Sequence, residues 1–156
     1  MRRLLYLTAI LLVFVSCSKD KFSDEPQIKL IELDRYTGDN LEFGNVNPPH
    51  AILELTDGNG DIGFRSGSDT SRIYIKNLLT GKEDSLFLPD LNTSATKNFK
   101  GELTVSLRSI VGGRDLPISA RPYSDTLYFE FYVKDFAGNK SNVVTNDQAF
   151  IYYTLP

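Results

Sequence analysis

The sequence predicts an all-β protein, and three observations support that prediction. Apolar and polar residues alternate with a period of two in several segments, most clearly in residues 126–134, 102–108 and 51–56. This alternation is typical of strands with one buried face. Clusters of glycine, proline, asparagine and aspartate separate the segments, as turns do. After residue 17, no window shows the 3.6-residue period of an amphipathic helix.

Weaker alternation adds strands at residues 28–33, 72–76, 85–88 and 149–153. About seven short strands with turns between them predict a single immunoglobulin-like β-sandwich, and a small β-barrel is the alternative. The Cys–Trp–Cys signature of antibody domains is absent, because the chain has no tryptophan. We expect the sandwich over residues 27–156. It is interrupted by a long surface loop at 109–124, where two glycines and two prolines occur.

The N-terminal residues MRRLLYLTAILLVFVSC have the layout of a bacterial export signal. Arg2 and Arg3 precede an apolar stretch that is too short for an ordinary transmembrane helix. The last four letters, FVSC, resemble the lipobox of bacterial lipoproteins, whose cysteine becomes N-terminal and lipidated. We therefore predict a signal peptide over residues 1–16, lipidation of Cys17, and a flexible polar tether over residues 17–26. An ordinary cleavable signal with an incidental cysteine is the alternative.

The cysteine content favours membrane attachment through Cys17, and the net charge argues against nucleic acid as a partner. Cys17 is the single cysteine, so an intramolecular disulfide is impossible, and lipidation would remove a free thiol from an oxidising compartment. Several acyl chains on one residue give stable membrane attachment. The net charge of −3 becomes two charges more negative when Arg2 and Arg3 leave with the signal peptide. Basic residues are scattered, so nucleic acid is not an expected partner.

Residues 57–63, DGNGDIG, form the most suggestive pattern for chemistry. Oxygen-bearing side chains alternate with glycines there, and a tight loop of this kind suits Ca²⁺, which accepts six to eight oxygens. The loop resembles the first half of an EF-hand calcium loop. Ser68 occupies the twelfth position, where an EF-hand has glutamate, and no flanking helices are expected. We therefore predict a calcium loop between strands, with a plain glycine–asparagine turn as the alternative.

Residues 133–142, VKDFAGNKSN, resemble the hairpin that ends many bacterial Ig-like and cadherin-like domains, with the pattern V-x-D-x-A-G-N-x-S. In a sandwich, the loop after the second strand and the loop before the last strand lie at the same end. The two aspartate-containing loops are therefore expected to meet. The predicted calcium ligands are Asp57, Asn59, Asp61, Asp135 and Asn139.

The lipobox, the DGNGDIG loop, the segment Gly101-Glu102-Leu103 and the DFAGNKSN hairpin together resemble small lipoproteins of the Bacteroidota. The resemblance covers most of the chain, and it implies an Ig-like fold and a lipid-anchored location at the outer membrane. Some such lipoproteins reach the cell surface through an acidic stretch after the cysteine. The corresponding residues here, SKDK at 18–21, are mixed in charge, so both the periplasmic face and the cell-surface face stay open.

The sequence contains no grouping that predicts catalysis. His50, the only histidine, follows two prolines and is expected in a loop. No G-x-S-x-G motif occurs, and one histidine with one lipidated cysteine does not suit zinc.

Tyr128 and Tyr132 lie opposite the apolar face of their predicted strand, and Tyr74, Tyr152 and Tyr153 are candidates to join them. Such tyrosines stack on sugars or dock a protein when exposed, and the alternative is that they pack across strands. We predict a non-enzymatic interaction or accessory module that is stabilised by calcium and binds an outer-membrane protein. A surface glycan-binding lipoprotein is the alternative.

Overall fold

The computed structural model of the protein describes residues 21–42, 47–63, 70–89 and 97–156, and nearly all of its regular structure is β. Among these residues, no helix has the length and apolar character needed to span a membrane. The elements are β1 (Gln27–Leu33), β2 (Thr37–Asp39), β3 (His50–Asp57), β4 (Arg72–Asn77), β5 (Glu83–Phe87), β6 (Phe99–Ser106), the 3₁₀ helix η2 (Ile118–Ala120), β7 (Tyr123–Leu127), β8 (Phe129–Lys134), β9 (Val144–Thr145) and β10 (Phe150–Thr154).

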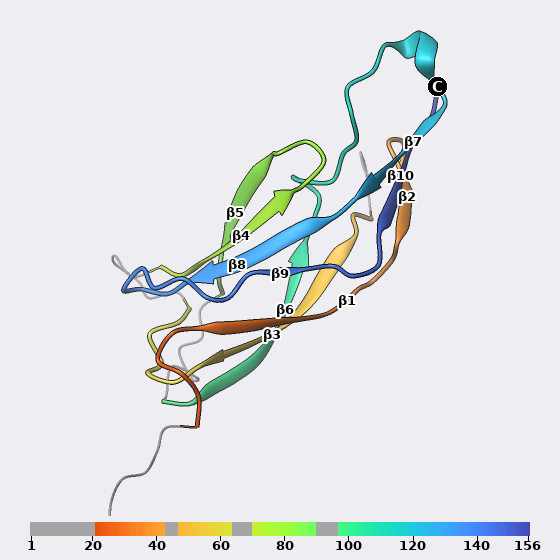
Figure 1. Ribbon diagram of the computed structural model, residues 1–156. Helices are drawn as coiled ribbons and strands as arrows, with labels where there is room; N and C mark the ends of the chain where they lie inside the picture. Colours follow the sequence, from red (N-terminus) through yellow and green to blue (C-terminus); the bar gives the residue numbers. More distant parts are fainter. Residues whose placement is uncertain (1–20, 43–46, 64–69, 90–96) are drawn as a thin grey trace, which may run out of the picture.

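Two antiparallel sheets form a β-sandwich (Figure 1). One sheet has the order β1-β3-β6, and the other has the order β5-β4-β8-β9. A third sheet, β2-β10-β7, extends the molecule at the end marked by the C-terminus, and β2 runs parallel to β10 within it. A three-stranded sheet facing a four-stranded sheet is the layout of an Ig-like sandwich. The predicted all-β sandwich is therefore confirmed.

Strict alternation of apolar residues orients the central strands. In β3, Ala51, Leu53 and Leu55 are fully buried, while the residues between them are only partly covered. In β8, Phe131 and Val133 are likewise fully buried from the other sheet. Burying a large apolar side chain contributes roughly 1.5–3 kcal/mol, so these inner faces supply the main driving force for packing the two sheets together.

The strand predicted at residues 126–134 is divided in the structure. Its first part belongs to β7, which pairs with β10, and its second part is β8, which pairs with β4. The change of partner occurs at Tyr128, whose carbonyl accepts a hydrogen bond from the Leu78 amide at 2.9 Å. Leu127 and Phe129 are both fully buried, so side-chain alternation continues where the hydrogen-bond partner changes.

Two further strands, β2 and β9, were not predicted. Thr37–Asp39 includes a glycine and an aspartate, which are typical of turns, but it lies along the C-terminal strand β10. The surface loop expected at 109–124 lies between β6 and β7, although its last residues, Tyr123 and Ser124, begin β7. The buried carboxylate of Asp125 holds this loop by accepting hydrogen bonds from the Arg114 amide at 2.8 Å and Nε at 2.5 Å.

Candidate metal centre

Three aspartates meet at the end of the sandwich where β3 and β8 finish. Asp57 is the last residue of β3, Asp61 lies in the loop that follows, and Asp135 comes directly after β8. One carboxylate oxygen of each lies within 4.8 Å of the others. β3 and β8 belong to different sheets and end on the same side of the molecule (Figure 1), so side chains distant in sequence come together. The two loops therefore meet, as the sequence predicts.

The loop after β3 is fixed by hydrogen bonds between its side chains and its own backbone. Asp57 Oδ1 accepts a hydrogen bond from the Gly60 amide at 2.6 Å, and Asn59 Oδ1 accepts one from the Asp61 amide at 3.0 Å. Gly60 has φ of 78°, a left-handed conformation that favours glycine. The Phe136 amide donates to the Asp61 carbonyl at 3.0 Å, which joins this loop to the hairpin after β8.

The hairpin after β8 orients the Asp135 carboxylate through Asn139. The Asn139 amide donates to Asp135 Oδ1 at 2.7 Å, and Asn139 Nδ2 donates to Oδ2 at 2.8 Å. Asn139 therefore positions the carboxylate, as Asn59 shapes the other loop. Of the five predicted ligands, the structure gathers the three aspartates. Direct ligation by the two asparagines stays a prediction.

Two carboxylate oxygens at this site are buried without a partner. Asp57 is fully buried, and neither Asp57 Oδ2 nor Asp61 Oδ1 accepts a hydrogen bond from any described residue. Leaving a buried charged group unpaired costs more than the roughly 1–3 kcal/mol of a neutral one. A cation between the three carboxylates would supply the missing partner.

The pKa values of the aspartates also indicate that negative charge at this site is unfavourable without a cation. Burial raises the pKa of Asp57 to about 6, opposed by the Gly60 hydrogen bond and assisted by the charges of Asp61 and Asp135. Burial and the charge of Asp135 also raise the pKa of Asp61. Carboxylate oxygens are hard ligands, which suit Ca²⁺ and Mg²⁺.

Residues 21–26 lie against the same site, and the sequence did not indicate this. The Gly58 amide donates to the Ser23 carbonyl at 2.6 Å, and Asn98 Oδ1 accepts hydrogen bonds from the Lys21 and Phe22 amides. Within the predicted tether over residues 17–26, Lys21, Phe22 and Ser23 thus make hydrogen bonds with the domain, while residues 17–20 lie outside the described part of the chain. Contacts made by backbone amides and carbonyls cannot be predicted from the pattern of apolar and polar side chains.

Several sequence predictions concern residues outside the described part of the chain. These are the signal peptide over residues 1–16, the lipidated Cys17 and Ser68 of the EF-hand comparison. They stay predictions.

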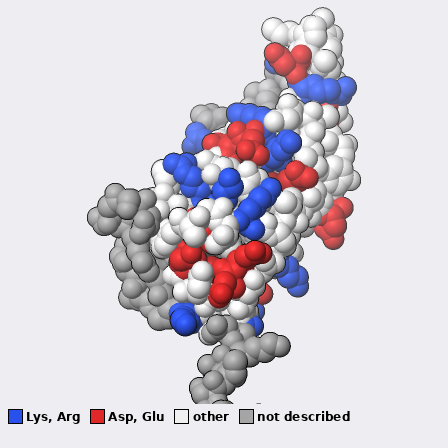
Figure 2. All heavy atoms as spheres, turned by 60° about the vertical axis from the view of Figure 1, so that its left-hand side comes forward, with Lys and Arg blue, Asp and Glu red and all other residues white. Residues whose placement is uncertain are grey.

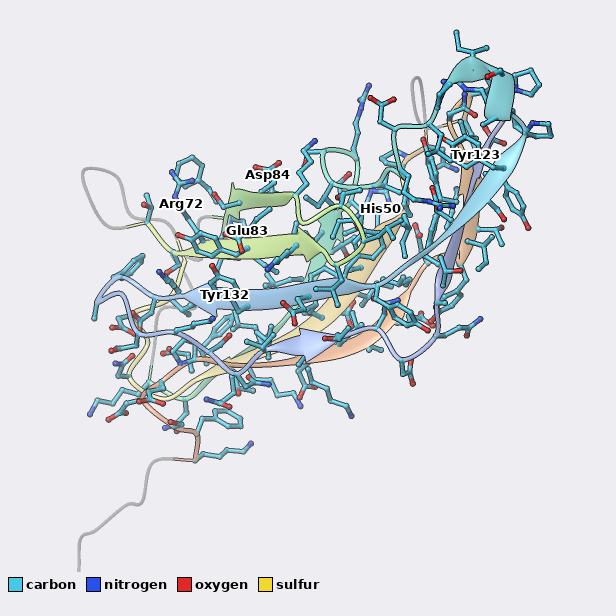
Figure 3. All side chains as sticks on the ribbon, turned by 45° about the horizontal axis from the view of Figure 1, so that its top comes forward. His50, Arg72, Glu83, Asp84, Tyr123 and Tyr132 are labelled. Atoms are coloured by element: carbon cyan, nitrogen blue, oxygen red, sulfur yellow. The ribbon has the colours of Figure 1, made fainter. Side chains whose placement is uncertain are left out.

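The tyrosines predicted to share one exposed face lie on different sheets of the structure. Tyr132 stacks on Tyr74 of the neighbouring strand, with ring centroids 4.6 Å apart and 4° between the planes, and Lys140 Nζ lies 4.0 Å from the Tyr132 ring centre. Burial and then the charge of Glu83, which lies beside it (Figure 3), raise the pKa of Tyr132. Cross-strand packing therefore describes this pair, whose facing ring surfaces are covered.

The other tyrosines lie apart from that pair. Tyr128, at the junction of β7 and β8, is 38% exposed. Tyr152 and Tyr153 belong to β10 in the third sheet.

His50, the single histidine, begins β3 at the end opposite Asp57. Its Nδ1 lies 3.0 Å from Asp34 Oδ2, and its amide donates to Asp34 Oδ1 at 2.9 Å. In Figure 3 it lies well away from Tyr132 and Glu83. This pairing joins the start of β3 to Asp34, which directly follows β1.

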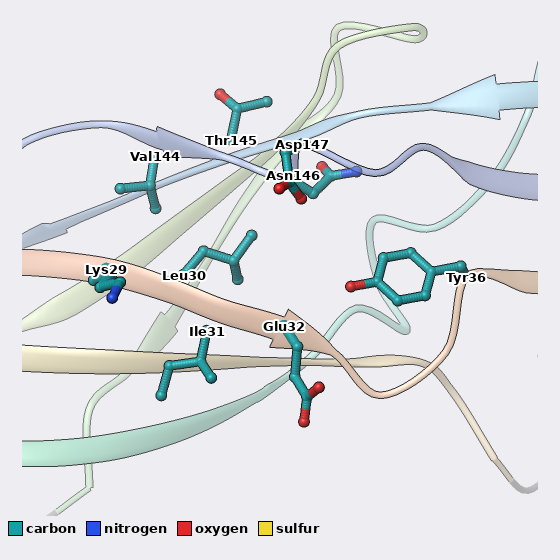
Figure 4. Close-up of a pocket in the computed structure, with 9 residues that line it drawn as sticks. All are labelled: Lys29, Leu30, Ile31, Glu32, Tyr36, Val144, Thr145, Asn146 and Asp147. Atoms are coloured by element: carbon teal, nitrogen blue, oxygen red, sulfur yellow. The ribbon is translucent and has the colours of Figure 1, made fainter.

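A groove of about 240 Å³ lies between β1 and β9, where the edges of the two sheets approach without pairing (Figure 4). Apolar and charged side chains share its walls, and the Tyr36 hydroxyl points into it. Charge on the molecular surface is also mixed, since Figure 2 shows acidic and basic side chains interspersed on one face. The residues lining the groove are Lys29, Leu30, Ile31, Glu32, Tyr36, Val144, Thr145, Asn146 and Asp147.

No protein family matches the sequence, and no curated protein matches it. Among solved structures, a Se-Met labelled β-glucosidase from Kluyveromyces marxianus is similar to the chain with a TM-score of 0.31 and 7% sequence identity. The similarity covers 83% of this chain and 15% of that chain, so the protein spans a small part of the enzyme's length. A likeness at this level indicates no shared activity.

Proposed function

We propose that the protein is a lipid-anchored, non-enzymatic binding module of the outer membrane, whose sandwich is stabilised by Ca²⁺ held between Asp57, Asp61 and Asp135. The observation that supports the metal most strongly is the pair of buried, unpartnered oxygens of Asp57 and Asp61. An ionised carboxylate buried at the end of a core strand destabilises the fold unless it takes up a proton or a positive charge is supplied.

The donor set favours Ca²⁺ over Mg²⁺. Three carboxylates come from two separate loops, and Ca²⁺ accepts six to eight oxygens in flexible geometry. Backbone carbonyls and water would complete its coordination. Mg²⁺ holds its own water more tightly and demands regular geometry, so it is expected to bind more weakly.

Binding of an outer-membrane protein is the role we assign to the module, and Cys17 would supply the anchor. The groove between β1 and β9 is the surface we propose for the partner, because unpaired strand edges with adjacent apolar and charged side chains suit a protein segment. The non-enzymatic assignment follows from the sequence, which contains no grouping of nucleophile, acid and base that predicts catalysis.

Thermal unfolding in Ca²⁺ and in chelator tests the metal assignment. A ligand at about 100 times its Kd stabilises the folded state by roughly 2.7 kcal/mol, which raises the Tm of a domain of this size by about 5 °C or more. Excess Mg²⁺ should give a smaller shift. The double variant Asp57→Ala/Asp61→Ala should lose the Ca²⁺ response, whereas Asp115→Ala/Asp147→Ala, which removes two exposed acids, should keep it. A wild-type Tm that ignores Ca²⁺ would refute the assignment.

Extraction of the tagged protein from its native membrane in mild detergent tests the binding role. We expect a companion membrane protein at fixed stoichiometry, and substitution of Ile31 and Val144 by aspartate in the groove should release it. A protein that purifies alone and binds a polysaccharide on a glycan array would contradict the proposal and favour the glycan alternative.

A further inference from the structure

We propose that the outer face of the four-stranded sheet binds a linear acidic polysaccharide through a row of three cations, formed by Arg72, Lys134 and Lys140. The ligand is a chain that bears carboxylate or sulfate groups along its length. This cation row is separate from the three aspartates and from the groove between β1 and β9. It therefore adds a ligand to the proposed function and does not depend on it.

The three cations are direct neighbours across the sheet. Arg72 pairs with Lys134 in the register of β4 and β8, and Lys134 pairs with Lys140 through an isolated bridge. Residues opposite one another in an antiparallel pair share a face with Cβ atoms about 4.5–5.5 Å apart, so the row spans about 10 Å. Like charges in such positions destabilise a sheet. Strand pairing alone therefore does not favour the row, whereas an anionic ligand would.

The Arg72 guanidinium is fixed by two contacts. Its Cζ lies 3.9 Å from the centre of the Phe87 ring, and its Nη1 donates a hydrogen bond to Ser85 Oγ at 3.0 Å. Both partners belong to the edge strand β5, and Phe87 is 56% exposed. A guanidinium has five N–H donors, so this one keeps donors for a planar anionic group. The exposed Phe87 ring offers an apolar surface beside them.

The two lysines lie on the stacked pair Tyr74–Tyr132. Lys134 Nζ is 5.4 Å from the Tyr74 ring centre, and Lys140 Nζ is 4.0 Å from the Tyr132 ring centre. An ammonium group within about 6 Å of a ring centre is attracted by the electrons of the ring face. The tyrosines therefore help to position the two ammonium groups of the row.

The charge of the row is not balanced by neighbouring acids. In the part of the chain that the structure describes, none of the three cations forms an ion pair with a carboxylate. Lys76, further along β4, shows the contrast, because Glu83 and Glu130 lie opposite it on the two neighbouring strands. Four residues of strand, about 13 Å, separate Lys76 from Arg72. Positive charge is therefore available to a ligand at the row.

The position of the row favours a polysaccharide over other polyanions. β4 and β8 each lie between two other strands, so they lack the free backbone edge from which an extended peptide gains hydrogen bonds. A membrane surface would bring its negative charge against Glu83 and Glu130 as well as against the row. A linear chain can follow the row across the sheet without passing over these glutamates, and its sugar rings can contact Phe87.

Binding of the full-length protein, in mild neutral detergent, to dextran sulfate and to carboxymethyl dextran tests the site. Uncharged dextran should not bind. Arg72→Gln/Lys134→Gln should weaken binding of both charged polymers about three- to thirtyfold, because two exposed charge pairs are lost. Lys76→Gln/Lys82→Gln removes the same charge from the same sheet. At 0.1 M salt it should change the affinity less than about twofold, because these lysines lie beyond the Debye length of about 10 Å.

A second variant guards against loss of folding. If thermal unfolding shows that Arg72→Gln/Lys134→Gln is unstable, Lys140→Gln replaces it, because Lys140 is exposed and is not part of a named strand. This single change should weaken binding about two- to fivefold. Equal losses in the row variants and the Lys76→Gln/Lys82→Gln control, or no binding of either charged polymer by the wild type, would overturn the site.

Competition separates the polysaccharide from other polyanions. Polyglutamate, and neutral-detergent micelles that contain an anionic phospholipid, should displace dextran sulfate only at a higher concentration of charge. Displacement by either at a lower concentration would overturn the polysaccharide assignment. The row variants should also keep any companion protein, because the groove between β1 and β9 is unchanged in them. Loss of the companion together with dextran sulfate binding would assign the row to the companion and overturn the proposal.

Discussion

Asp57 is the residue on which the account of the site depends most. It ends a core strand, it is fully buried, and its Oδ2 has no hydrogen-bond partner among the described residues. Its neighbours Asp61 and Asp135 have the same charge. Such a residue destabilises the metal-free fold, and a bound cation would turn that cost into a gain in stability.

The raised pKa of Asp57 predicts how the metal-free protein responds to pH. Its pKa is about 6 in the folded chain and 3.8 without the fold, so the fold binds this proton more tightly than the unfolded chain does. Stability is then greatest below about pH 4, falls as the pH rises to about 6, and levels off above that. The loss amounts to on the order of 2–3 kcal/mol, at about 1.4 kcal/mol per pKa unit.

Urea unfolding in chelator, between pH 4.5 and 7, measures this loss. The pKa of Asp61 is also raised, by burial and then by the charge of Asp135, with a smaller contribution from Asp24, so Asp61 adds a change of the same sign. The wild type should therefore be compared with Asp57→Asn. The variant should be the more stable at pH 7, and its advantage should shrink at pH 4.5. An advantage that does not vary with pH would show that Asp57 does not titrate in this window.

Among the elements, the stacked pair Tyr74–Tyr132 ties β4 to β8 on the outer face of the four-stranded sheet. Aromatic pairs of this kind add about 0.5–1.5 kcal/mol beyond the area they bury. A double-mutant cycle of the two alanine variants, followed by urea unfolding, should return a coupling energy in that range. The pair Tyr74 and Tyr128, whose rings do not stack, serves as the control and should be additive. Additivity in both cycles would contradict a stabilising stack.

The strands differ in how well the sequence predicts them, and the reason is physical. β3, β4, β6 and β8 each have an inner face of alternating apolar residues, which is a local property of the sequence. β2 and β9 are short, and they exist because distant strands offer hydrogen bonds to them. The break between β7 and β8 is invisible for a related reason, since alternation reports burial and not the identity of the paired strand.

The candidate site shows the same division between local and distant information. The meeting of the loops around Asp61 and Asp135 could be predicted, because sandwich topology brings the ends of those strands together. The approach of residues 21–26 could not, since it depends on backbone carbonyls and on the absence of a side chain at Gly58. Gly58, next to the predicted ligand Asp57, was the one available signal, and a glycine there also fits an ordinary turn.

At the scale of the whole molecule, the cation site and the N-terminal segment occupy one end of the sandwich, and the third sheet with η2 occupies the other (Figure 1). A lipid anchor at Cys17 would place the cation end nearest the membrane. Cys17→Ser should block lipidation, so the protein should remain an uncleaved precursor or leave the membrane fraction. Mass spectrometry of the mature N-terminus checks this directly. A variant that still begins at residue 17 and sediments with outer membrane would contradict the anchor.

Isothermal titration calorimetry of the chelator-treated, full-length protein with Ca²⁺ tests the central claim most directly. We predict one site per chain, with a Kd of the order of 10⁻⁴ to 10⁻³ M, the range of extracellular calcium modules. Heat should disappear in Asp57→Ala/Asp61→Ala and persist in Asp115→Ala/Asp147→Ala. A wild-type titration without binding heat at any temperature tested, or one that Asp57→Ala/Asp61→Ala reproduces, would contradict a calcium site at these three aspartates.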